Sequence, residues 1–143
     1  MAKELDVRNL KVISLWQPWA EAMRLGLKKN ETRSWPTSYR GWLAIHAAKK
    51  KYNPNDYTPE FAHAMRARNI WPDTLTYGAV VCIVKLVGCE KSGRIREATS
   101  ENEQFWGDYS DGRYIWVTDP TSLVTLHEPI PLRGHQGLFD MPM

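Results

Sequence analysis

Apolar positions recur with strand-like and helix-like spacing along the chain, and this pattern predicts the order of its elements. Five segments are rich in β-branched and aromatic residues or alternate between apolar and polar positions, as strands do. These segments are residues 10–16, 41–48, 78–88, 113–118 and 123–130. Residues 78–88 are almost continuously apolar, which is typical of a strand buried on both faces. We expect Asp119 and Pro120 to separate the last two strands, because proline cannot donate a sheet hydrogen bond.

Short helices are predicted in the connections between these strands. They cover residues 18–25, 58–69 and 100–106. Gly26 is suited to end the first helix, and Ser100 with Glu103 has the spacing of a capping box at the start of the third. Residues 29–35 are predicted to be extended, whereas the polar segment 91–98 predicts a loop.

The order of elements favours an α+β fold built on a compact, partly closed β-barrel with short helices inserted between the strands. A doubly wound parallel sheet is disfavoured because strands and helices do not alternate regularly. The chain has 143 residues, so we expect one domain spanning residues 1–143. Its closing residues 134–139 predict a glycine-containing turn followed by an apolar plug.

Composition and charge narrow the classes of partner. The net charge of +3 and the pI near 8.9 permit an anionic partner but fall short of a strongly basic nucleic-acid-binding domain. Seven Trp and six Tyr can serve a core or stack on bases. No apolar run is long enough for a signal peptide or a membrane span, so we expect a cytoplasmic protein without a membrane partner. Cys82 and Cys89 are seven residues apart, on opposite faces of a regular strand, which predicts two free thiols.

The segment from Gly26 to Trp35 is the most promising candidate for a functional site. If it is extended, Glu31 and Arg33 point to the same face, and Lys28 joins them only from a turn. A carboxylate can accept from the exocyclic amine of a nucleobase, while the two cations meet phosphate or carbonyl oxygens. The same residues equally suit a structural ion pair between Glu31 and Arg33.

Aromatic residues surround this charged trio in the sequence. Trp16, Trp35 and Trp42 precede or follow it, and a ring at one of these positions could stack on a base, although each alone also suits a core. His46 shares a strand face with Trp42, so it can line the same site or pack as an ordinary core histidine.

Basic residues suggest an electrostatic rim around the candidate site. The cations concerned are Lys49, Lys50, Lys51, Arg94 and Arg96. They would contact phosphates if the ligand is RNA, and otherwise keep the surface hydrated. The sequence contains no phosphate-binding glycine loop, nucleophile elbow, paired-histidine helix or zinc ribbon, so we expect neither a cofactor nor a metal.

Several motifs of the chain occur together in a characteristic order. The charged segment has the form Gly26-x-Lys28-x-x-Glu31-x-Arg33. Flanking motifs lie at Ser14–Trp19 (SLWQPW), Trp35–Pro36, Ile45–Lys49 (IHAAK) and Gln136–Phe139 (QGLF). Together they resemble the ASCH domain family, a group related to PUA domains, and the resemblance covers nearly the whole chain. It implies a PUA-like β-barrel with a cleft beside the first helix, in which RNA or a modified nucleoside is thought to bind.

The resemblance also implies which residues form the site. Ligand contacts are expected from motif residues Trp16, Gln17, Arg33, Trp35, His46 and Lys49. In amidohydrolase relatives, the lysine of the signature is assigned as the base and a threonine as the nucleophile. Lys28 matches the lysine, but Glu31 stands where those relatives have the threonine, and Thr32 is expected on the opposite face of the strand.

These observations leave three functions open. The leading interpretation is an RNA- or nucleotide-binding domain whose cleft recognises a nucleobase, modified or not. The alternative is a small hydrolase, either an N4-acetylcytidine amidohydrolase or a ribonuclease, in which Lys28 and a water activated by Glu31 carry the reaction. A third hypothesis is a protein-interaction domain whose cleft binds no base.

Overall fold

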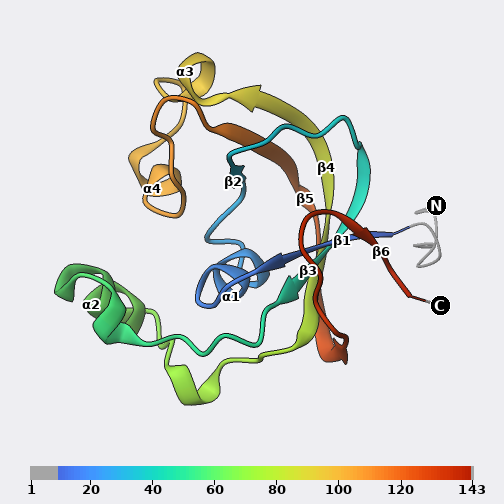
Figure 1. Cartoon of the computed structure of the whole chain (residues 1–143). Coiled ribbons are helices and arrows are strands. Elements are labelled where there is room, and N and C mark those ends of the chain that lie inside the picture. Colours follow the sequence, from blue (N-terminus) through green and yellow to red (C-terminus); the bar gives the residue numbers. More distant parts are fainter. Residues whose placement is uncertain (1–9, 143) are drawn as a thin grey trace.

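A strongly curved mixed sheet dominates the computed structural model, which describes residues 10–142 (Figure 1). Within these residues, six strands follow the order β2-β5-β4-β3-β1-β6. Their bounds are β1 Lys11–Leu15, β2 Glu31–Arg33, β3 Gly41–Ala47, β4 Ala79–Lys91, β5 Tyr114–Pro131 and β6 Phe139–Asp140. β1 and β3 are parallel, and the other neighbouring pairs are antiparallel. The sheet forms a half-barrel with β2 and β6 at its open edges, which confirms the predicted α+β, PUA-like, partly closed barrel.

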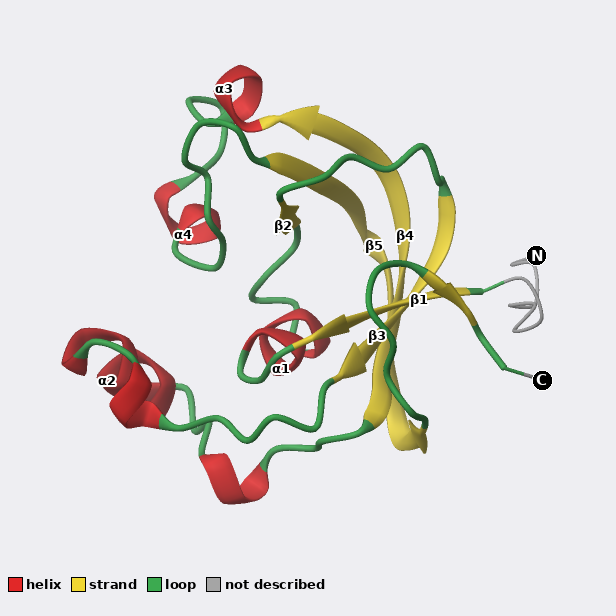
Figure 2. Ribbon diagram, in the orientation of Figure 1, coloured by secondary structure: helices red, strands yellow, loops and turns green. Residues whose placement is uncertain are grey.

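Short helices occupy the connections between the strands. They are α1 Trp19–Arg24, α2 Pro59–Ala67, α3 Ser92–Ile95 and α4 Glu101–Gln104, with 3₁₀ turns η2 Pro54–Asp56 and η3 Pro72–Thr74. Figure 2 shows α1 on the concave side of the sheet, and α2 and α4 on the same side but farther from the strands. None of the helices in the described part of the chain has the length and apolarity needed to cross a bilayer.

The central strand β4 carries the core. It pairs with β3 on one side and β5 on the other, and residues 79–84 are all buried because both of its faces are covered. Cys82 lies in this run, and burial raises the pKa of its thiol to about 12. Cys82 and the half-buried Cys89 are both free thiols, as the sequence predicted.

Two predictions about the elements were wrong. β5 continues through Asp119 and Pro120, because residues 120–123 form a bulge between the pairs Lys85–Asp119 and Ile83–Val124. A bulge removes the need for a proline N–H donor, so the strand resumes beyond it. The segment predicted as a loop contains α3, whose first residue Ser92 is anchored by its hydroxyl to the carbonyl of Ser110 at 2.7 Å.

A buried histidine fastens the C-terminal segment to the sheet. The Nδ1 atom of His46 lies 2.8 Å from the hydroxyl of Ser14, and its Nε2 atom lies 2.6 Å from the carbonyl oxygen of Leu132. Gly134 passes so close that a Cβ atom there would meet the imidazole Cε1 at 2.8 Å, so this position requires glycine. Beyond it, β6 pairs with β1 and completes the edge of the sheet.

We predict that His46 makes stability depend on pH. Burial lowers the pKa of His46; the hydrogen bond to Leu132 opposes this effect, and His135 adds to it. Because the folded state prefers the neutral ring, the stability that His46 contributes is complete above about pH 6.5 and is lost as the pH falls through its lowered pKa. Denaturant unfolding between pH 7.5 and pH 5 should therefore show a decline that His46→Gln flattens. The exposed His63→Gln serves as the control, and equal slopes in the parent and His46→Gln would contradict the prediction.

Candidate functional site

The turn between α1 and β2 directs the charged signature into the protein. Gly26 has a φ of 74°, a value that ends α1 at low cost for glycine. The amides of Leu27 and Lys28 then both donate to the carbonyl of Ala22, at 2.9 and 3.1 Å. This tight turn points the Lys28 side chain inward before the chain enters β2 at Glu31.

Lys28 is one of the most buried side chains of the described chain, with the residue only 2% exposed. Its Nζ donates to the carbonyl oxygens of Asn30, at 2.5 Å, and Trp106, at 2.9 Å. The same atom lies 3.3 Å from Oε1 of Glu31. Three N–H groups thus face three oxygen atoms, which is the arrangement that a buried ammonium requires.

Glu31 is surrounded by donors from the same segment. Its Oε1 also accepts from the amide of Thr32 at 3.1 Å, and its Oε2 lies 3.0 and 2.8 Å from Nε and Nη2 of Arg33. Burial alone raises the pKa of Glu31, but the charges of Lys28 and Arg33 and the Thr32 amide outweigh burial and bring that pKa below its ordinary value. Arg33 in turn donates to the carbonyl of Ser14 at 2.8 Å, which connects β2 to β1.

A second carboxylate fixes the turn from outside. Ser100 caps α4 by accepting from the amide of Glu103 at 3.1 Å, so half of the predicted capping box forms. The carboxylate of Glu103 accepts instead from the amides of Lys29 and Asn30, at 3.0 to 3.1 Å. Glu103 therefore links α4 to the signature turn.

A cleft of about 930 Å³ opens beside this network. Its wall includes all three residues of β2, the end of β1, the start of α1, and residues from η2, α2 and the segment 105–113. The volume lies within the range of small-molecule and cofactor sites. Thr32 also lines the cleft, although strand alternation predicts the opposite face, because the cleft wraps around this edge strand.

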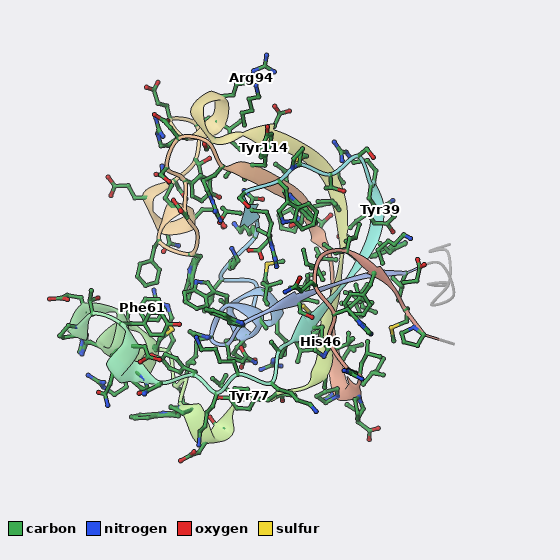
Figure 3. The ribbon with its side chains drawn as sticks, in the orientation of Figure 1. Tyr39, His46, Phe61, Tyr77, Arg94 and Tyr114 are labelled. Atoms are coloured by element: carbon green, nitrogen blue, oxygen red, sulfur yellow. The ribbon has the colours of Figure 1, made fainter. Side chains whose placement is uncertain are left out.

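Aromatic rings cover much of the cleft. Trp19 of α1, Phe61 of α2, and Phe105 and Trp106 just after α4 form a chain of contacts, with ring centroids 5.7, 5.7 and 4.8 Å apart in that order. Figure 3 shows Phe61 on the side of α2 that faces this region. Trp16 is 53% exposed at the edge of the cleft and Phe105 is 40% exposed, so both offer ring surface to a ligand.

Polar groups from the segment after α4 complete the wall. The amide of Asp108 donates to the Thr32 hydroxyl at 3.0 Å, and Nη2 of Arg113 donates to the Thr32 carbonyl at 3.2 Å. Hydrogen bonds from the hydroxyl and amide of Ser110 to Oδ1 lower the pKa of Asp108. Its Oδ2, 3.6 Å from Nε of Arg113, accepts no hydrogen bond within residues 10–142.

The structure brings only some of the predicted site residues to the cleft. Trp16, Glu31 and Arg33 line it, and Lys28 lies behind them. The four other predicted ligand contacts, which do not line the cleft, are Gln17, Trp35, His46 and Lys49.

Each of these four side chains has another place in the fold. Gln17 is buried and bonds to the amide of Glu21 and the carbonyl of Thr76, both at 2.8 Å. The Trp35 ring packs edge-on against Trp116, with the ring centroids 4.8 Å apart. His46 fastens the C-terminal segment, as described above, and the Lys49 stem lies along Gly78.

The predicted basic rim divides into separate groups. Lys50 lies over the Trp16 ring, with its Nζ 3.6 Å from the centroid, at the edge of the cleft. Lys51 pairs with Asp73 at 2.8 Å, away from the cleft. Arg94 and Arg96 lie in and just after α3, apart from these two lysines, where Figure 3 labels Arg94.

Sequence reasoning missed the contribution of residues 105–113. Phe105, Asp108 and Arg113 lie more than 70 positions after the signature, and no spacing rule connects the two segments. Tyr57 and Phe61, which also line the cleft, were not among the predicted site residues. Histidine, cysteine, aspartate and glutamate do not gather in groups of three or more that could hold a metal ion, in the part of the chain that the structure describes.

The half-barrel, with its buried signature and adjoining cleft, defines a PUA-like domain. The sequence model of the ASCH domain family matches residues 13–123, and the chain belongs to this family. Activating signal cointegrator 1 from Homo sapiens and from Mus musculus are each 26% identical over 133 residues, which is 90% of this chain. The matched region is 22% of each relative, so the chain spans about a fifth of their length.

Solved structures support the fold. The crystal structure of ASCH from Zymomonas mobilis aligns with a TM-score of 0.55 and 15% identity, covering 94% of this chain and 89% of that one. Two mutant proteins of the same domain align with TM-scores of 0.53 and 0.54. At this level of identity, the similarity concerns the fold alone.

We predict that Glu31→Gln destabilises the protein strongly. The substitution removes the charge that compensates Lys28 and Arg33, and loss of one partner of a buried ion pair costs about 3–5 kcal/mol. Denaturant unfolding measures the difference. The control is Glu90→Gln, whose side chain is 45% exposed and lies 4.0 Å from Arg94, and it should stay within about 0.5 kcal/mol of the parent. A Glu31→Gln variant as stable as this control would show that the network is dispensable.

Proposed function

We propose that the cleft binds a nucleobase, either in RNA or in a modified nucleoside. The observation that carries this proposal is the combination of exposed aromatic surface with free polar groups in one cleft of suitable volume. Stacking on tryptophan or phenylalanine rings and hydrogen bonds to the base edge are the two means by which proteins recognise unpaired bases.

Trp16 is the proposed stacking surface. It is the most exposed of the large apolar residues in the described chain, and it lies at the edge of the cleft. Lys50 covers part of the ring at 3.6 Å and brings a positive charge to the same place. A base stacked on Trp16 would therefore have a cation near its sugar or phosphate.

Asp108 and Arg33 are the proposed groups for the base edge. The protein's own donors already surround both oxygens of Glu31, whereas Oδ2 of Asp108 is free to accept from an exocyclic amine. Arg33 uses Nε and Nη2 inside the protein, and its Nη1 makes no hydrogen bond within residues 10–142. Glu31 then acts as support for Arg33, while Asp108 accepts and Arg33 donates.

The geometry gives no support to Lys28 as a general base. A base needs a free lone pair within reach of the substrate, but the three N–H groups of Lys28 face protein oxygens behind the cleft wall. The hydrolase hypothesis is therefore tested together with binding, by an assay for reaction products.

We predict that Trp16→Ala weakens nucleoside binding by about 1–3 kcal/mol, the usual contribution of one stacked base. Calorimetric titration would use the four ribonucleosides, their 5′-monophosphates and N4-acetylcytidine. Trp16→Phe should retain most of the affinity, because it keeps an aromatic face. Trp71→Ala, at a tryptophan that is 43% exposed outside the cleft, is the matched control and should bind like the parent.

The same samples are also assayed for cytidine and acetate. Absence of binding to every compound, or equal losses in Trp16→Ala and Trp71→Ala, would overturn the proposal. Deacetylation of N4-acetylcytidine by the parent protein would instead restore the hydrolase alternative.

A further inference from the structure

The charges around the cleft nearly cancel. Three carboxylates and two guanidinium groups line it: Glu31, Asp56, Asp108, Arg33 and Arg113. Arg33 is also neutralised directly, because its Nη2 lies 2.8 Å from Glu31. Lys28 behind Glu31 and Lys50 over Trp16 bring the total charge close to zero, so the cleft can accept a neutral base but offers little free positive charge to several phosphates in a row.

A basic groove lies beside the cleft, around α3. It consists of two adjoining cavities of about 400 and 330 Å³, which share Lys91, Arg94 and Tyr114 in their walls. Four cations line this α3 groove, namely Arg40, Lys91, Arg94 and Arg113, against two carboxylates, Glu90 and Asp111. The wall of the groove therefore carries an excess of positive charge that the cleft lacks.

Three of the four cations of the α3 groove are poorly compensated, whereas Arg113 lies 3.6 Å from Asp108. Lys91 is exposed and has no ion-pair partner within residues 10–142, and Arg40 donates only to the carbonyl oxygens of Thr37 and Tyr39. The Arg94 side chain is 78% exposed and lies 4.0 Å from Glu90, a weak surface pair. Asp111 already pairs with Arg96 at 2.8 Å, so it neutralises little of the groove.

Arg113 connects the groove to the cleft, since its side chain lines both. Figure 3 shows Arg94 and Tyr114 at the same end of the molecule. The cleft and the groove therefore adjoin at Arg113, and a strand that passes this residue would reach from one to the other. The half-buried Tyr114 ring adds an aromatic surface to the wall of the groove.

We propose that the α3 groove binds the sugar–phosphate backbone of a single-stranded RNA whose neighbouring base occupies the cleft. This inference rests on the proposed function and narrows it, because it selects a strand of several nucleotides over a free nucleoside. Aromatic surface and uncompensated cations in one continuous path are typical of sites for single-stranded nucleic acids. An acidic peptide would use the cations but neither Tyr114 nor the base site.

The experiment compares ligands of different length at several salt concentrations. The parent and variants are titrated, by fluorescence anisotropy or calorimetry, with four homotetraribonucleotides and the matching nucleoside 5′-monophosphates. The parent should bind its preferred tetranucleotide on the order of tenfold more tightly than the mononucleotide at low salt, with a marked salt dependence.

Lys91→Glu/Arg94→Glu tests the groove without touching the cleft. This double variant should bring the tetranucleotide to the affinity of the mononucleotide and reduce the slope of log K against log salt by about 1.4, as expected when two phosphate contacts of a single strand are lost. The affinity for the mononucleotide should stay within about twofold. Lys85→Glu/Arg133→Glu changes the net charge equally at exposed positions outside both cavities, and should retain the length preference.

The outcomes separate this inference from the function on which it rests. Mononucleotide binding without any gain for the tetranucleotide, or a gain that survives in Lys91→Glu/Arg94→Glu, overturns the groove and leaves the base site standing. Competition by tetraglutamate as strong as that by the tetranucleotide also overturns it, in favour of an acidic protein partner. Failure of every nucleotide here and of every nucleoside in the preceding titration overturns both proposals.

Discussion

The buried ammonium of Lys28 is the constraint on which the site depends. Removal of one such ion from water costs several kcal/mol, and this cost is offset only where oxygen atoms surround the charge. Here the oxygens come from three places: the turn before β2, the strand β2 itself, and the end of α4. One side chain therefore holds together segments that are 78 residues apart in the chain. Without these acceptors the turn, the edge strand and the α4 segment would have no common anchor.

A chain of polar contacts connects Lys28 to the wall of the cleft. Glu31 compensates Lys28 and orients Arg33, and Arg33 reaches the last residues of β1 through the carbonyl of Ser14. Thr32 lies between them, and its hydroxyl accepts a hydrogen bond from the amide of Asp108, which holds that segment against β2. The polar groups that face the cleft are thus supported by a layer of buried partners, which is the usual requirement for a precise binding site. The aromatic side is held differently, by ring contacts among three short helices.

Features that depend on neighbouring residues alone could be predicted from the sequence. The turn at Gly26 and the shared face of Glu31 and Arg33 follow from residue preferences and from the period of a strand, and both are present. The continuity of β5 across Pro120 could not be predicted, because a bulge against β4 removes the need for the missing donor. The position of Asp108 was likewise hidden, since it depends on pairing between β2 and β5 and on a loop that no spacing rule relates to the signature. Long-range pairing and the satisfaction of buried charge, rather than propensity, decided these features.

The spacing of the signature has a physical reason that does not involve a ligand. The lysine must lie in the turn before the strand so that its side chain can reach the glutamate from the interior. The arginine must follow the glutamate by two positions so that both side chains lie on the same face of the strand. A motif with these requirements specifies the wall of the cleft. Of the ligand contacts proposed above, only Arg33 belongs to the motif, whereas Trp16 and Asp108 lie outside it. Domains with the same signature could therefore share a fold and a cleft while they differ in what the cleft accepts, because most of the proposed contacts are carried by side chains outside the buried ion network.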